Sequence, residues 1–149
     1  MKNTITILLL FSSLLNLSFQ NQANQIGNLK VTVTNIRSAK GEIEFALFNK
    51  SDGFGSDVTK AYKRMRGKIT NEACTISFNN IPYGQYAVEI YHDENNNKKF
   101  DETWYGMPKE GVSVSNNPSL GIFSPPKFET AKFFFDASKN NISIQIKYL

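Results

Sequence analysis

The chain has 149 residues, a formal net charge of +4 and 40% hydrophobic residues. This length fits one domain that can bury a hydrophobic core without disulfides. The single cysteine, Cys74, excludes an internal disulfide framework. Because Cys74 shares a strand face with Ile76 and Phe78, we expect a buried thiol rather than a reactive or intermolecular one.

The first residues have the composition of an export signal. Lys2 gives a positive start, and an apolar run follows over residues 5–17. This run is too short, and too polar at its end, to span a bilayer. We expect a signal peptide over residues 1–20, cleaved between about residues 20 and 23, and a polar linker over 21–27; a buried N-terminal helix is the alternative. The mature protein would then be periplasmic or extracellular, with no membrane span and no nucleic-acid partner.

Period-two alternation of apolar and polar residues, interrupted by turn residues, predicts seven strands in the rest of the chain. They cover residues 29–34, 42–47, 62–69, 75–78, 86–92, 131–135 and 142–148. Strands at this spacing, without helices between them, indicate an all-β fold, an antiparallel seven-stranded β-sandwich of Ig-like architecture over residues 28–149. Odd-numbered apolar residues of the first two strands would face even-numbered ones of the later strands.

A turn at Pro82 and Gly84 separates two of these strands. Together with Tyr86 it resembles the leucine-proline-x-glycine-x-tyrosine turn of transthyretin-like and carboxypeptidase-regulatory-like sandwiches. This resemblance implies a fold and no function. The transthyretin-like purine-pathway hydrolases end in Tyr-Arg-Gly-Ser, whereas this chain ends with residues 145–149 as Gln-Ile-Lys-Tyr-Leu, so that activity is not expected.

The longest connection, residues 93–130, begins with oxygen-bearing side chains at alternate positions, a spacing that suits a loop around calcium. The predicted metal ligands are Asp93, Asn95, Asn97, Asp101 and, through its carbonyl, Lys99. Two positions depart from such loops: Lys98 stands where a sharp turn favours glycine, and Trp104 stands where a bidentate Glu is usual. Glu102 or Glu110 could take the place of that Glu. A metal-free turn, in which Asp and Asn bond their own backbone, is the alternative.

His92 is the only histidine, which argues against a zinc site. As a catalytic base it would pair with Asp93, Glu94 or Glu110. As a structural residue it would end the core-facing row of its strand, with its ring bonded to a loop carbonyl. The structural role is favoured, and the protein is more readily explained as a non-enzyme.

Two groups of side chains suggest contact with a partner. Trp104 and Tyr105 lie in a polar loop, where they could stack on the sugar rings of a glycan or fasten the loop to the sandwich. The densest basic cluster could touch an anionic polymer, although a solvated strand face is favoured. It comprises Lys60, Lys63, Arg64, Arg66 and Lys68.

Several motifs in order resemble one family. They are His-Asp-Glu-Asn-x-Asn-x-x-Phe-Asp at 92–101, Gly-Met-Pro-Lys-Glu-Gly at 106–111, Ser-Asn-Asn at 115–117 and Pro-Pro-x-Phe-Glu-x-Ala-x-Phe at 125–133. They resemble the small exported bacterial proteins of domain of unknown function 2141. The resemblance implies export and a small β domain, without naming a reaction. Lys98, where that family usually has Gly, and residues 112–114 depart from the pattern.

The sequence thus favours an exported, envelope-associated β-sandwich that works as a binding or accessory module, with calcium as a candidate cofactor in the loop 93–101. Its partner would be a cell-envelope polymer, a glycan or a protein. The alternatives are an enzyme that uses His92 with nearby carboxylates, and a surface glycan-binding domain. The sequence does not predict the oligomeric state.

Overall fold

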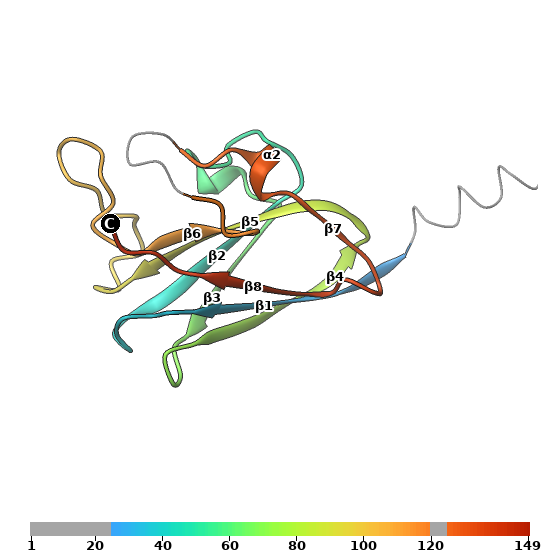
Figure 1. Ribbon diagram of the computed structural model, residues 1–149, viewed down its shortest axis with the longest axis horizontal. Coiled ribbons are helices and arrows are strands. Elements are labelled where there is room, and N and C mark those ends of the chain that lie inside the picture. Colours follow the sequence, from blue (N-terminus) through green and yellow to red (C-terminus); the bar gives the residue numbers. More distant parts are fainter. Residues whose placement is uncertain (1–24, 120–124) are drawn as a thin grey trace, which may run out of the picture.

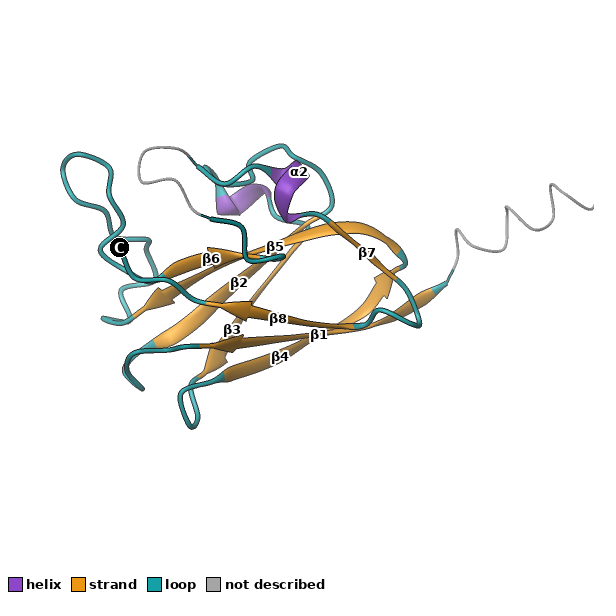
Figure 2. Cartoon of the chain, viewed as in Figure 1, coloured by secondary structure: helices purple, strands orange, loops and turns teal. Residues whose placement is uncertain are grey.

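The computed structural model describes residues 25–119 and 125–149, and the expected signal peptide lies outside these described residues. Two β-sheets pack face to face and carry almost all of the regular structure (Figure 2). The smaller sheet has three strands in the order β4-β1-β8. They are β1 (Ile26–Thr34), β4 (Cys74–Pro82) and β8 (Asn141–Gln145).

The larger sheet has five strands, four of them in the order β3-β2-β5-β6, while β7 pairs with the other end of β5 (Figure 1). They are β2 (Glu42–Phe48), β3 (Lys63–Lys68), β5 (Gly84–Asp93), β6 (Val112–Val114) and β7 (Phe133–Phe135). Only Tyr83 separates β4 from β5, so the predicted turn carries the chain from one sheet to the other.

The core between the sheets follows the predicted alternation. Leu29, Val31 and Val33 on β1 are fully buried and pack with Val88 and Ile90 on β5. Since successive side chains of a strand point to opposite faces, one apolar row per strand is enough to form this core. Cys74 belongs to the same cluster, as predicted, and burial raises the pKa of its thiol to about 11.

A second apolar cluster covers one end of the outer face of the larger sheet. Phe48 packs edge-to-face on Phe54, which packs in the same way on Phe128. Two short helices, η1 (Val58–Lys60) and α2 (Phe128–Ala131), lie over this end. The other end of the same face carries charged residues and the loop that follows β5.

The predicted β-sandwich is therefore confirmed, with differences in detail. The structure has eight strands in place of seven, because β6 lies inside the connection 93–130. One pair, β1 with β8, is parallel, although all neighbours were expected to be antiparallel. Residues 128–131 form the helix α2, so the strand predicted over 131–135 begins later, at Phe133.

Candidate functional site

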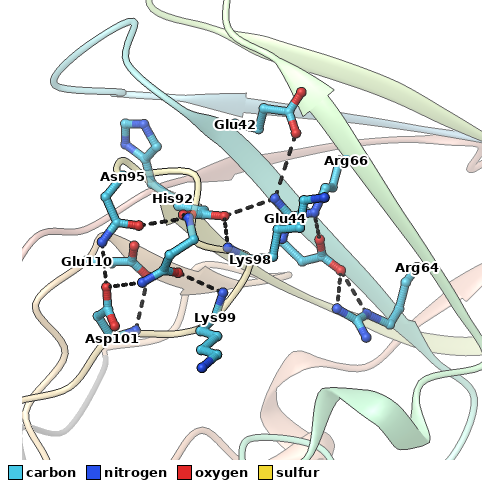
Figure 3. A network of polar contacts seen from close by, with 12 residues as sticks. Glu42, Glu44, Arg64, Arg66, His92, Asn95, Lys98, Lys99, Asp101 and Glu110 are labelled. Atoms are coloured by element: carbon cyan, nitrogen blue, oxygen red, sulfur yellow. Dashed lines mark hydrogen bonds and ion pairs between the residues drawn. The ribbon is translucent and has the colours of Figure 1, made fainter.

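The loop 93–101 begins at the last residue of β5, and a network of polar contacts joins its side chains (Figure 3). Asp93 is fully buried. Its Oδ1 accepts a hydrogen bond from the backbone N–H of Asn97 at 3.1 Å, and its Oδ2 accepts one from Lys98 N–H at 2.9 Å. These bonds turn the chain back on itself within five residues, which is how Asp and Asn side chains stabilise turns.

The other predicted ligands gather around Asp101. The side-chain amides of Asn95 and Asn97 both donate to Asp101 Oδ2, at 2.7 and 2.8 Å. Their amide oxygens accept the N–H of Asn97 at 2.9 Å and of Lys99 at 2.8 Å. Hydrogen bonds within the loop therefore link the side chains of Asp93, Asn95, Asn97 and Asp101, although Asn95 and Asn97 are exposed.

Lys98 has the backbone conformation that its position in the loop suggests. Its φ is +63°, in the left-handed region that favours glycine. A residue with a Cβ atom loses about 1–2 kcal/mol in this conformation. The bond from Lys98 N–H to Asp93 helps to hold it there. The strain expected from Lys at this position is thus present in the structure.

Glu110 completes the network from the far side of the connection. Its Oε2 accepts the N–H of Asp101 at 3.2 Å. Its Oε1 is buried and has no hydrogen-bond partner among the described residues. Burial raises the pKa of Glu110, and the charges of Asp101 and Asp93 raise it further. Glu102, the other candidate for the missing acidic ligand, pairs with Pro108 in the following turn. The sequence offered Glu102 and Glu110 equally as the missing acidic ligand, and of these two only Glu110 accepts a hydrogen bond from Asp101 in the structure.

On its other side, Asp93 joins an ion-pair network that the sequence did not reveal. Arg66 on β3 places one terminal nitrogen 2.9 Å from Asp93 Oδ2 and its Nε 2.9 Å from Glu44 Oε2. Arg64 lies 2.7 Å from Glu44 Oε1. Glu44 and Asp93 are 3% and 0% exposed. The signal that could have found this network is the opposite charge at facing positions, since Glu44 pairs in register with Arg66.

This network changes the interpretation of the basic cluster. Arg64 is exposed and Arg66 is partly exposed, yet both pair with buried carboxylates of the same sheet. Lys60 pairs with Asp52 at 2.8 Å. Three of the five predicted members of the cluster are therefore occupied by the protein's own acids, and the cluster is a weaker candidate for binding an anionic polymer.

His92 is sealed inside the sandwich. It is 0% exposed, its Nε2 lies 2.7 Å from the carbonyl oxygen of Lys40, and its Nδ1 lies 2.8 Å from Tyr148 Oη. A carbonyl only accepts, so Nε2 carries the proton and Nδ1 accepts the Tyr148 hydroxyl hydrogen. Tyr148 Oη in turn accepts the N–H of Arg37. Neither ring nitrogen is left for a carboxylate, which is the geometry expected for the structural role.

Trp104 and Tyr105 lie at the tip of a turn that projects from the sandwich, in the gold loop of Figure 1. Their exposed fractions are 95% and 54%, and their rings meet edge-to-face with centroids 5.1 Å apart. Backbone bonds close the turn, from Thr103 N–H to Met107 O and from Gly106 N–H to Thr103 O. Trp104 does not fasten the loop to the sandwich; Phe100 does this by packing on Tyr91. Phe123, another aromatic of this connection, lies outside the described residues.

The described part of the chain holds no group of three His, Cys, Asp or Glu side chains placed to bind a metal ion. Among the described residues, no helix is long and apolar enough to cross a bilayer. The donors that come together after β5 are a mixture of carboxylates and amides, and the exposed aromatic turn follows them directly in the chain.

Comparison with known proteins gives one match. Residues 31–143 match the family model described as "Uncharacterized protein conserved in bacteria (DUF2141)". No curated protein and no solved structure matches the chain. The matched range runs from β1 to β8 and includes the polar network, the aromatic turn and both sheets. The chain belongs to the DUF2141 family of bacterial proteins.

Proposed function

We propose that this protein is an exported binding module of the bacterial cell envelope, and that it binds an acidic polysaccharide through the aromatic turn at residues 103–107. The observation that carries the proposal is the exposure of Trp104, 95%, on a turn closed by its own hydrogen bonds. Export is supported by the positive start and the apolar run of residues 5–17.

A rigid exposed aromatic pair is suited to contact with a partner. Trp and Tyr offer a large apolar face with little loss of side-chain entropy, and they are enriched where one side of a contact is apolar and the other is wet. Bonds from Met107 N–H to Thr103 Oγ1, at 2.9 Å, and from Lys109 N–H to Asp101 O stiffen the turn further. Trp104 and Tyr105 therefore require little additional ordering when a partner binds.

The size of the aromatic surface favours a sugar over a protein. A stable protein interface buries about 1,200–2,000 Å² in total, whereas the turn presents Trp104 and Tyr105 amid polar loop residues. The two rings meet at 84°, so each offers its own apolar face to a sugar unit.

Three lysines near the turn support an acidic polysaccharide, although Asp101, Glu102 and Glu110 lie in the same segment. Lys98, Lys99 and Lys109 flank the turn in the chain and are exposed. Within residues 25–119 and 125–149 none of the three forms an ion pair with an acid. Unlike the arginines of β3, these lysines are available to a polyanion. The formal net charge of +4, which becomes +3 once Lys2 is removed with the signal peptide, acts in the same direction.

A polysaccharide array tests the proposal. The full chain is applied to neutral and acidic bacterial envelope polysaccharides, together with Trp104→Ala and the control Phe134→Ala. Phe134 is 46% exposed on β7, at the opposite end of β5 from the turn. We expect binding to acidic members that weakens about tenfold in Trp104→Ala, as for the loss of one aromatic contact, and is kept in Phe134→Ala. Binding to no polysaccharide, or equal binding by both variants, would contradict the proposal.

Export has its own measurement. Fractionation of cells that produce the full chain should place the protein outside the cytoplasm, with an N-terminus that begins between about residues 21 and 24. A cytoplasmic protein that retains Lys2 would refute the export part of the proposal and leave the polysaccharide part to be judged by the array.

A further inference from the structure

Glu110 poses a physical problem that the rest of the fold does not solve. Its side chain is 4% exposed, and its Oε1 has no hydrogen-bond partner among the described residues. The other oxygen receives the N–H of Asp101, at 3.2 Å, and the backbone N–H of Glu94 also lies close enough to lower the pKa of this carboxyl. Leaving a buried acceptor unsatisfied costs about 1–3 kcal/mol, and more when it is charged. A cation bound beside Glu110 would remove this penalty.

The groups next to Glu110 are the ones that a hard cation needs. Asp101 is tied to Glu110 through its own N–H, and Asp101 Oδ2 gathers the side chains of Asn95 and Asn97 within 2.8 Å. Figure 3 shows Glu110 beside Asp101 and Asn95. Two carboxylates and two amides, without His or Cys, form an oxygen donor set, and calcium prefers such a set in a flexible geometry.

We propose that a calcium ion binds between Asp101 and Glu110, with the side-chain oxygens of Asn95 and Asn97 as further ligands. Glu110 supplies the acidic ligand that the loop lacks at Trp104. Asp93 is not a ligand in this site, because its oxygens accept the N–H groups of the loop and an ion pair from Arg66. Asp93 shapes the loop, and the cation lies on the side that faces Glu110. Water and the Lys99 carbonyl complete a coordination of six to eight oxygens.

Binding requires the two amides to rotate, which predicts weak affinity. At present their N–H groups face Asp101, and their oxygens accept backbone N–H groups at 2.9 and 2.8 Å. Rotation exchanges two hydrogen bonds, each worth about 1 kcal/mol, for two metal contacts. With two carboxylates as the charged ligands, we expect a dissociation constant of about 10⁻⁴–10⁻³ M, in the range of extracellular modules.

The site would also act on the aromatic turn. Asp101 and Glu110 stand at the two ends of the segment that carries Trp104, and Lys109 N–H already donates to Asp101 O across its base. An ion shared by both carboxylates clamps this base. This inference does not depend on what the turn binds, because the ligands and their test involve neither Trp104 nor a polysaccharide.

Calorimetric titration of the full chain with calcium chloride, paired with melting curves in chelator, tests the site. We expect one ion per chain and a melting temperature raised by about 5 °C when calcium exceeds its dissociation constant tenfold. Magnesium at the same concentration should have a smaller effect, because it demands a stricter octahedral geometry. No heat of binding and no change in melting temperature at that concentration would overturn the proposal.

Two matched variants locate the ion. Glu110→Gln should weaken calcium binding at least tenfold, while Glu102→Gln, which removes the same charge from an exposed residue of the same turn, should leave it unchanged. Equal affinity in Glu110→Gln and the unchanged protein, or an equal loss in both variants, would refute the site. If Glu110→Gln does not fold, Asp101→Asn makes the same test, with the same outcomes for and against.

Discussion

Replacement of Arg66 by Met tests whether the charges on the outer face of the larger sheet hold the fold together. Arg66 lies in register with Glu44 on the neighbouring strand and contacts both Glu44 and Asp93 at 2.9 Å. A third acid, Glu42, is 3.7 Å away. Met keeps most of the length of the side chain and removes the charge, so Arg66→Met leaves two buried carboxylates with less compensation.

The expected loss of stability depends on the contacts that Glu44 and Asp93 keep in the variant. Breaking a buried ion pair by removing one partner costs about 3–5 kcal/mol. Glu44 keeps Arg64 at 2.7 Å, and Asp93 keeps the N–H groups of Asn97 and Lys98. We therefore expect the lower end of the range, a loss of about 3 kcal/mol in the free energy of unfolding.

The matched control is Lys60→Met, which breaks an exposed pair. Lys60 and its partner Asp52 are 49% and 53% exposed, so the expected loss in the free energy of unfolding is much smaller than for Arg66→Met. Both variants are unfolded with urea in the presence of chelator, at low and at high salt. High salt should remove the effect of Lys60→Met and leave most of that of Arg66→Met, since buried pairs are screened less. A loss in Arg66→Met below about 0.5 kcal/mol, or one equal to that of Lys60→Met, would refute the reasoning.

Three other predictions concern the core and its edge. Tyr148→Phe leaves the buried Nδ1 of His92 without a donor and should lower the free energy of unfolding by about 1–3 kcal/mol; an unchanged urea midpoint would speak against it. A Cβ atom at Gly67 would lie 2.4 Å from Cys74 Sγ, so Gly67→Ala should lower the free energy of unfolding by about 1–3 kcal/mol. Cys74→Ala in the same chain should recover part of that loss. If the losses of the two variants simply add in the double variant, the contact is disproved. Burial raises the pKa of Glu89, so the folded state binds its proton more tightly, and stability falls as pH rises from the ordinary to the raised pKa. Glu89→Gln should therefore raise the melting temperature at neutral pH and have no effect below the ordinary pKa. A gain of equal size at both pH values would contradict this cause.

Part of the candidate site could be predicted from the sequence because its hydrogen bonds join residues that are close in the chain. The bonds from Asp93 to the N–H groups of Asn97 and Lys98 span four and five residues. Such turns depend on side chains that reach their own backbone, so alternating Asp and Asn predict them directly. The choice of Glu110 over Glu102 depends on how the following turn folds back, and spacing alone does not determine that.

By itself, the sequence determined most of the strands, with approximate ends, and which face of each of them is buried. The period of two in Leu29, Val31 and Val33 follows from backbone geometry and needs no knowledge of the partner strand. For the same reason it predicted a buried Cys74 and a folded loop after His92.

Only the tertiary structure decided which strands and charges meet. Three of these contacts join positions that are distant in the chain: the parallel pairing of β1 with β8, the hydrogen bond of His92 with Tyr148, and the ion pair of Arg66 with Asp93. The strand β6 has three residues, which is too short for a periodic signal. Such contacts are fixed by the packing of the whole sandwich, in which most buried polar groups find a partner wherever the fold places one.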